Sequence, residues 1–259
     1  TSYSIILLCK FVKRFSIKFT VEQEGKMIQL EISNAEIEEF CEEIVKDYIN
    51  RYTPGMEKVN IHGLITEYLG LKIEAAFIAE DDETIIAYLS NGKRPLQIRS
   101  NGKTVRVLYP KNTIVIDQSL LVNDKVIRRR FCMAHEAGHY LIDKLCRTNI
   151  NVTQSITADQ LHYAYHVEES RANKFAAALL LPKFIVEDAL KKYNNGNPIH
   201  VFGENVFAPR ERMTLNQMTN LLGVSFQTLY IRFKQFGMLD YRPFGELLEN
   251  HIFESGGSV

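Results

Sequence analysis

The sequence predicts an α+β fold, in which a small mixed or antiparallel sheet lies among amphipathic helices. Short alternating segments separated by Asn-Gly turns occupy the middle of the chain, while segments with helical periodicity occupy both flanks. Apolar residues make up 46% and charged residues 24% of the 259 residues, which is typical of globular proteins rather than disordered ones. The chain contains no internal repeat, which excludes a solenoid.

The N-terminal elements are a hairpin followed by a helix. Apolar and polar residues alternate over 15–33, which predicts two short paired strands. Ser33 and Glu36 have the spacing of a capping box, and apolar residues then recur at helical spacing over 34–50. The residues before the hairpin are interpreted as a poorly ordered leader, because their charges follow the short apolar run instead of preceding it as in a signal peptide.

The middle of the chain is expected to form the sheet. Asn60 is expected to cap a short helix over 61–69, and short β-like runs follow it at 71–77, 85–89, 104–109 and 113–116. The run 113–116 is a candidate edge strand to which an extended substrate can add, although an internal strand is the favoured interpretation.

The remaining segments are predicted to be mainly helical. The pattern predicts helices at 124–145, 167–181 and 183–193, with a polar stretch at 147–165, and a helix-turn-helix-like pair at 214–236. In that pair Gly223 provides the turn and Ser225 caps the second helix. The last residues, 254–259, are expected to be a mobile tail.

The first chemical signal is the sequence His-Glu-Ala-Gly-His at 135–139, an HExxH motif inside a predicted helix. Residues four apart lie on the same helix face, so His135 and His139 can bind one tetrahedral metal ion. Glu136 is rotated by about 100° from His135. It therefore lies beside the ion, where a carboxylate can take a proton from bound water. The alternative, two ordinary histidines facing a core, has a high desolvation cost.

A hydrolytic zinc site needs a third protein ligand and one open position. Glu169 lies three residues before Ala172 on the apolar face of helix 167–181, where a carboxylate is costly unless it is paired or binds metal. Glu169 is therefore the predicted third ligand. The alternatives that remain are Glu168, His162, His166 and His200, with Cys132 as a conceivable soft fourth ligand.

The two motifs together resemble the ImmA/IrrE family of zinc metallopeptidases. The stretch RRRFCMAHEAGHYLI is followed by EESRANKFAAALLLP, and the family pattern has HELGH followed by E-x-x-A-N-x-F-A and a proline. Ala137 departs from the usual leucine without touching the ligands. The resemblance implies a zincin-like core over residues 34–200, after the leader and hairpin at 1–33. A helical extension is expected over 201–259. The resemblance also implies that Glu169 is the third ligand.

The resemblance further implies a zinc-dependent endopeptidase that acts in the cytoplasm on a helix-turn-helix transcriptional repressor. Zn²⁺ lowers the pKa of its bound water to about 7, and Glu136 is the expected general base. Candidate donors to the substrate carbonyl are Tyr140, His162, Tyr163, Tyr165, His166 and Arg171. The sequence leaves two alternative functions open: a zinc-stabilised module that binds a repressor without cutting it, and a DNA-binding regulator.

Partners of other kinds are disfavoured by the charge and hydropathy of the chain. Lys plus Arg and Asp plus Glu both number 31, so any nucleic-acid contact has to be local. The region around the helix-turn-helix-like pair is locally basic through Arg210, Arg212, Arg232 and Lys234. We expect it to pack or to dock a protein, and DNA contact is the weaker hypothesis. No apolar run is long enough to cross a membrane.

Overall fold

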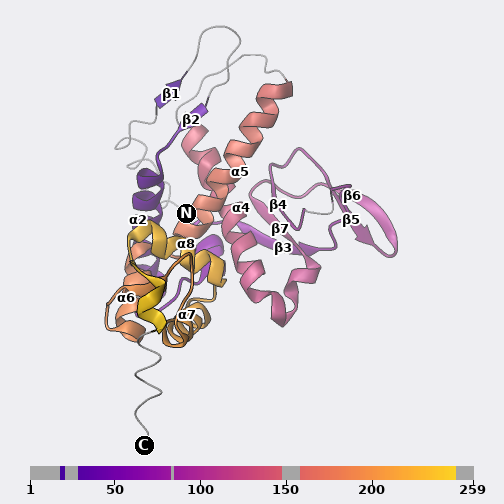
Figure 1. Cartoon of the computed structure of the whole chain (residues 1–259). Coiled ribbons are helices and arrows are strands. Elements are labelled where there is room, and N and C mark those ends of the chain that lie inside the picture. Colours follow the sequence, from indigo (N-terminus) through magenta and orange to yellow (C-terminus); the bar gives the residue numbers. More distant parts are fainter. Residues whose placement is uncertain (1–17, 21–28, 83–84, 148–157, 249–259) are drawn as a thin grey trace, which may run out of the picture. The chain divides into compact units, whose positions relative to one another are not determined.

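The computed structural model describes residues 18–20, 29–82, 85–147 and 158–248, and its helices and small sheets confirm the predicted α+β class (Figure 1). The chain divides into two compact units, Thr1–Pro182 and Lys183–Val259. The predicted leader and tail lie outside the described residues. The functional division into 1–33, 34–200 and 201–259 stays a prediction.

The predicted hairpin and first helix are both confirmed. Strands β1 (Lys18–Thr20) and β2 (Gln29–Glu31) pair antiparallel, and helix α2 (Asn34–Tyr52) follows. The Ser33 hydroxyl accepts from the Glu36 amide at 3.2 Å, and the Glu36 carboxylate accepts from the Ser33 amide at 2.7 Å. Both hydrogen bonds of the capping box are therefore present, which explains where the helix begins.

The short helix after α2 also begins where the sequence predicts. The Asn60 side chain accepts a hydrogen bond from the Gly63 amide at 3.2 Å and so caps α3 (Ile61–Gly63). The helix continues as a π-helical turn over Leu64–Tyr68. Leu64 and Ile65 are fully buried, so this segment anchors the start of the sheet region in the core.

The central sheet has the order β3-β7-β4 and is mixed. Strand β3 (Lys72–Ala76) pairs parallel to β7 (Thr113–Asp117), whereas β4 (Ala87–Ser90) pairs antiparallel to β7. The possibility that 113–116 is an edge strand is therefore wrong. Neighbours pair on both sides of β7, and its first four residues are buried, as their continuous apolar character favours. Strand β4 is an edge of this sheet.

A separate hairpin joins β4 to β7 along the chain. It consists of β5 (Leu96–Ser100) and β6 (Lys103–Val107), which pair antiparallel across an Asn101-Gly102 turn. The predicted run 104–109 corresponds to β6, whereas β5 was not predicted from the sequence. Only the first residue of β5 is fully buried, and its apolar residues alternate with polar ones. The hydrophobic pattern of this strand is therefore weak.

Helices α4 (Val126–Arg147) and α5 (Ala158–Leu180) pack against each other in the first unit. A Cβ atom added at Gly138 would lie 2.9 Å from the Ala172 carbonyl oxygen, so the glycine permits this close approach. Helix α5 begins nine residues earlier than predicted, within the expected polar stretch 147–165. The predicted start was placed where the apolar face of the helix begins. Polar residues before that point also favour helix, so the helix starts earlier than its apolar face does.

The second unit contains the predicted helix-turn-helix-like pair. Helices α7 (Pro209–Leu222) and α8 (Phe226–Phe236) form the pair, and helix α6 (Lys183–Asn194) precedes it, as predicted. Strands β8 (Ile199–Phe202) and β9 (Leu239–Arg242) form a parallel pair that was not predicted. Gly223 ends α7 with φ of 63°, which favours glycine. The Ser225 hydroxyl accepts from the Thr228 amide, as a cap does.

Arg232 differs from its predicted role as a surface cation. Its side chain is only 1% exposed, its guanidinium lies 4.3 Å from the centre of the Phe236 ring, and it donates to Gln235 at 2.9 Å. Lys234, two residues later on α8, is exposed. The basic surface expected from these helices is therefore smaller than the sequence indicates.

Candidate metal centre

Helix α4 presents the two histidines of the HExxH motif on one face. His135 and His139 are one turn apart, and their Nε2 atoms lie 3.1 Å from each other. Both side chains are mostly buried, with 16% and 17% of their surface exposed. The helical spacing that the sequence analysis used thus brings both imidazoles to one point.

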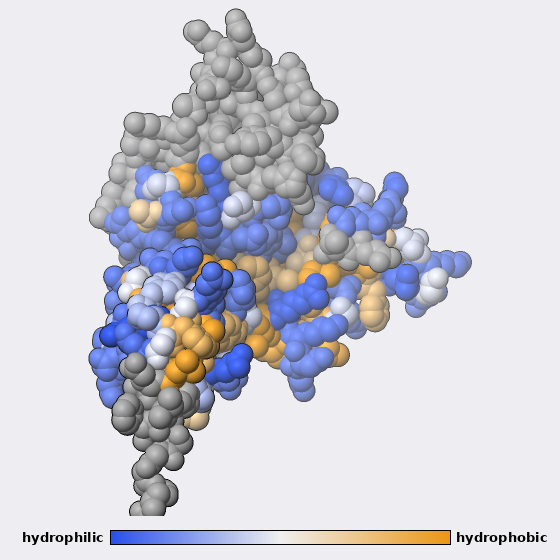
Figure 2. Space-filling model, viewed as in Figure 1, coloured by the Kyte–Doolittle hydropathy of each residue, from blue (hydrophilic) through white to orange (hydrophobic). Residues whose placement is uncertain are grey.

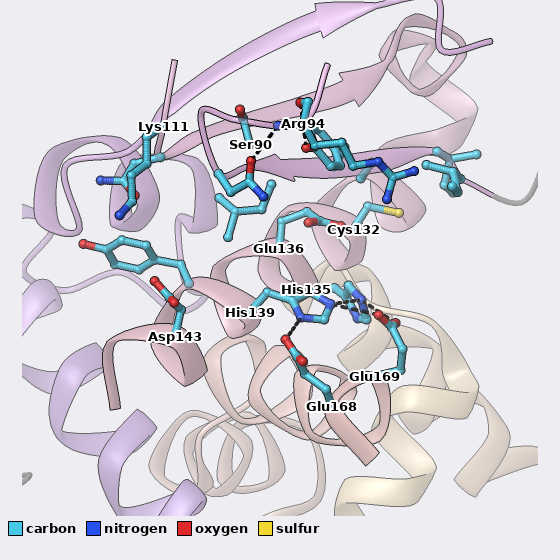
Figure 3. A pocket seen from close by; sticks show the side chains of 18 of the residues that line it. Ser90, Arg94, Lys111, Cys132, His135, Glu136, His139, Asp143, Glu168 and Glu169 are labelled. Carbon is cyan, nitrogen blue, oxygen red and sulfur yellow. Dashed lines mark hydrogen bonds and ion pairs between the residues drawn. The ribbon is translucent and has the colours of Figure 1, made fainter. Parts of the chain in front are cut away.

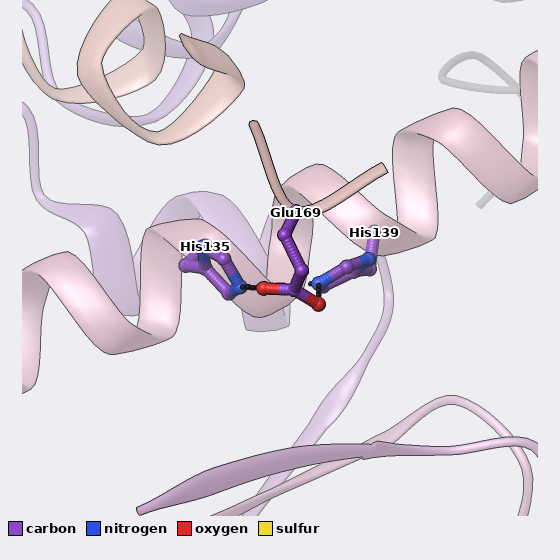
Figure 4. A group of neighbouring side chains, drawn as sticks. All are labelled: His135, His139 and Glu169. Carbon is purple, nitrogen blue, oxygen red and sulfur yellow. Dashed lines mark hydrogen bonds and ion pairs between the residues drawn. The ribbon is translucent and has the colours of Figure 1, made fainter. Parts of the chain in front are cut away.

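Glu169 reaches the same point from α5, and Figure 4 shows its carboxylate between the two imidazoles. Its Oε2 atom lies 3.1 Å from Nε2 of His135, and its Oε1 atom lies 3.2 Å from Nε2 of His139. Within the described part of the chain, these three residues form the group that can hold a metal ion.

The other ligand candidates lie elsewhere. Glu168 contacts the outer side of His139, and His200 belongs to β8 in the second unit, where Glu211 and Asp240 flank it. Cys132 is partly buried and is not a member of the group, and burial raises the pKa of its thiol. The side chains of His162 and His166, like those of Tyr163 and Tyr165, lie outside the described residues.

The three side chains lie close enough to share one ion. Two ligand atoms at about 2.0–2.1 Å from a tetrahedral ion are separated by about 3.3–3.4 Å. The two Nε2 atoms lie 3.1 Å apart, and each lies 3.1–3.2 Å from a different oxygen of Glu169. A His₂Glu donor set with one further position open is also the set that hydrolytic zinc enzymes use. The residues present therefore suit a metal ion without rearrangement of the helices.

Two further residues of α5 hold the imidazoles from behind. The Asn173 Oδ1 atom lies 3.0 Å from Nδ1 of His135, and Oε1 of Glu168 lies 3.2 Å from Nδ1 of His139. When each Nδ1 donates to these oxygens, the proton is held on Nδ1, and each Nε2 is left with the lone pair that a metal ion needs.

These outer positions were not predicted from the sequence, where Glu168 was an alternative third ligand. Because α5 begins at Ala158, Glu168 lies well inside the helix. A usable signal was the spacing of Asn173, which lies one turn after Glu169 on the same face.

The electrostatics differ between the two histidines. Burial lowers the pKa of His135. Burial also acts to lower the pKa of His139, but the hydrogen bond to Glu168 and the charges of Glu136 and Glu169 outweigh it, so the net shift is upward. The hydrogen bond to His139 in turn holds the pKa of Glu168 below its usual value.

Glu136 lies beside the metal-binding group and is not part of it. Its side chain is 7% exposed, and burial raises its pKa to about 7. The backbone amide of Leu89 donates a hydrogen bond to the carboxylate and partly opposes that shift. The base candidate therefore lies between α4 and the edge strand β4.

These side chains open into a cavity of about 550 Å³ (Figure 3). One wall is β4 with the residues that flank it, and the opposite wall is α4 with Glu168 and Glu169 of α5. Arg94, Lys111 and Asp143 are further charged residues in the lining, none of which the sequence analysis singled out. Tyr140, one of its candidate donors, also lines the cavity.

The chain was compared with curated proteins, solved structures and models of protein families. No curated protein matches the chain. A solved structure, a transcriptional regulator from Mycobacterium tuberculosis, is similar with 14% identity and a TM-score of 0.41, over 77% of this chain and 46% of that one. This chain therefore spans about half the length of that regulator.

The model of the Peptidase_M78 family, described as the IrrE N-terminal-like domain, matches residues 99–234. The match covers more than half of the chain and includes both helices of the metal-binding group. It agrees with the resemblance found in the motifs, and the chain belongs to the Peptidase_M78 (IrrE N-terminal-like) family.

Proposed function

We propose that the chain is a zinc-dependent endopeptidase in which His135, His139 and Glu169 bind the ion and Glu136 is the general base. One observation carries the proposal: a buried carboxylate lies in the cavity next to the metal-binding group but outside it. A purely structural metal site has no need of such a residue. A peptidase needs it, because water must lose a proton to attack a carbonyl.

In this proposal the residues of the site have separate roles. A bound Zn²⁺ would polarise the substrate carbonyl and acidify water at neutral pH. Glu136 takes the proton from the attacking water and delivers it to the leaving amine. Glu168 and Asn173 hold the two imidazoles in orientation through their Nδ1 atoms.

Strand β4 is the proposed docking edge for an extended peptide. The carbonyl groups of Ile86 and Ser90 accept hydrogen bonds from residues at the two ends of β7. In an antiparallel pair alternate residues point their backbone groups to opposite sides, so those of Ala87 and Leu89 face away from β7. The Leu89 amide already donates to Glu136, so a peptide added at this edge as a further strand would lie beside that carboxylate in the same cavity.

The proposed substrate is a helix-turn-helix transcriptional repressor, cut at a restricted site in the cytoplasm. This part of the proposal rests on family membership and on the motif resemblance. The structure contributes one compatible finding: none of the described helices is long and apolar enough to cross a membrane.

The test compares the wild-type chain with Glu136→Gln, which keeps the size of the side chain but removes the base. Each is co-expressed with a repressor encoded beside it, and the fragments are identified by mass spectrometry. We expect zinc content to stay normal and cleavage to fall by a factor on the order of 10² or more. If both chains bind the repressor and neither cuts it, the sequestering module replaces the peptidase. Salt-dependent binding of duplex DNA without cleavage supports the DNA-binding regulator.

A further inference from the structure

Residues 91–112 are strongly basic within a chain that has equal numbers of basic and acidic residues. This segment contains no Asp or Glu and six cations: Lys93, Arg94, Arg99, Lys103, Arg106 and Lys111. It runs from the end of β4 through the β5–β6 hairpin to the start of β7. The charge is therefore confined to one structural feature, which we term the basic hairpin.

The structure leaves all six cations accessible. Each is exposed, and none forms an ion pair with any residue that the structure describes. The hairpin packs through Leu96, Ile98 and Val107, which join a small apolar cluster around Val115. Arg99 and Arg106 lie on the hairpin face opposite to these apolar residues, and hydrophilic residues cover much of the hairpin at the right of Figure 2.

The basic hairpin is continuous with the candidate active site. Arg94 and Lys111 line the same cavity as His135, Glu136 and His139. Figure 3 shows the two cations on the β4 side of that cavity, opposite α4. Two of the six cations therefore line the cavity itself, and the chain between them carries the other positive charges.

The basic hairpin also carries exposed apolar side chains. Val105 is 39% exposed and lies on the hairpin face of Lys103, while Leu108, which follows β6, is 57% exposed. A surface for nucleic acid is built from cations and polar groups that contact phosphates. A surface that mixes unpaired cations with apolar side chains, and that leads into a peptide-binding cavity, suits a protein segment that is acidic and partly apolar.

We infer that the basic hairpin docks an acidic, partly apolar segment of the protein substrate and so guides the adjoining peptide into the cavity. The inference rests on the proposed peptidase function and names its substrate class. It also restricts how a repressor can bind: the basic face that contacts DNA is repelled by this surface, so the docking segment lies outside that face.

The test measures binding rather than cleavage. The zinc-loaded Glu136→Gln chain is titrated into a labelled peptide that alternates glutamate with leucine, and fluorescence anisotropy is followed at low and moderate salt. The probe variant adds Lys103→Glu and Arg106→Glu, two exposed residues outside the cavity. The matched control adds Lys58→Glu and Lys174→Glu, which are exposed, lie outside the basic hairpin and give the same total charge. Arg99 is left intact because it borders a second cavity that contains Glu80 and Asp117.

We expect the probe variant to bind the peptide about tenfold more weakly, or worse, at low salt and the control to bind normally. A glutamine–leucine peptide should bind poorly to all three chains. Equal binding by probe variant and control overturns the inference, and so does tighter, equally charge-sensitive binding of duplex DNA. If peptide binding depends on Lys103 and Arg106 but the wild-type chain hydrolyses no peptide, the docking surface is supported and the peptidase proposal fails.

Discussion

The Nδ1 atom of His139 lies 3.2 Å from Oε1 of Glu168, on the side of the ring opposite the Nε2 atom that faces Glu169. Adjacent residues of α5 thus approach the same imidazole from two sides, one at the metal-binding atom and the other behind it. A carboxylate behind a ligating histidine fixes its tautomer and increases its basicity. We therefore propose Glu168 as the residue that orients His139 when an ion is bound.

Removing this contact should weaken metal binding without abolishing it. We expect Glu168→Ala to lower zinc affinity by about 10–100-fold. Glu168→Gln retains an acceptor oxygen and should lose less. Competition with a chromophoric chelator measures both. Glu169→Ala, which removes a proposed ligand, is the reference for near-complete loss. Normal zinc content in Glu169→Ala would reassign the third ligand, and an unchanged affinity in Glu168→Ala would leave that residue without a positioning role.

The packing of α4 on α5 gives a second prediction. In Gly138→Ala the new Cβ atom would lie 2.9 Å from the Ala172 carbonyl oxygen and 3.0 Å from the Phe175 Cβ atom. The helices must separate, which should cost about 1–3 kcal/mol of folding free energy and move Glu169 away from the histidines. Urea unfolding and zinc titration should both detect this. Gly245→Ala is the matched control, because no atom lies within 4 Å of its added Cβ.

The buried guanidinium of α8 gives a third prediction. From the sequence, Arg232 and Lys234 both contribute to the locally basic region that is expected to pack or to dock a protein. The two residues differ in exposure, because Arg232 is buried and Lys234 is exposed. Arg232→Glu places an acid at a position 1% exposed and should destabilise the chain by about 3 kcal/mol or more. Lys234→Glu changes an exposed residue and should stay within about 0.5 kcal/mol of wild type. Equal thermal unfolding of both variants would contradict this assignment.

The features that the sequence predicted correctly depend on local, periodic signals. The capping box at Ser33, the turn at Gly223 and the shared face of His135 and His139 each follow from residues within a few positions of one another. The position of Glu169 beside the two histidines agrees with the cost of placing a carboxylate on an apolar helix face. These arguments need no knowledge of how distant segments pair.

The features that the sequence missed depend on tertiary context. The position of β7 between β3 and β4 is set by pairing partners far along the chain, and β5 has a weak apolar signal of its own. Whether Arg232 is buried depends on the packing of α8 and not on its type. The same limit explains why β4, the wall of the cavity, was predicted as a strand but not as part of the site.

The pKa of Glu136 gives the last prediction, which concerns the metal-free chain. Burial raises this pKa from 4.5 to about 7, so the unfolded chain loses the proton at lower pH than the folded chain does. Between those values the unfolded state binds fewer protons, and stability therefore falls as pH rises, by a total of about 3 kcal/mol from this group. Glu136→Gln cannot ionise and should escape that loss. With a chelator present, the variant should gain stability relative to wild type between pH 5 and pH 8 in urea unfolding. Glu187→Gln, on the exposed face of α6, should show no such change. A difference between Glu136→Gln and wild type that does not vary with pH would mean that the carboxylate is ionised throughout, and that burial does not make it a stronger base.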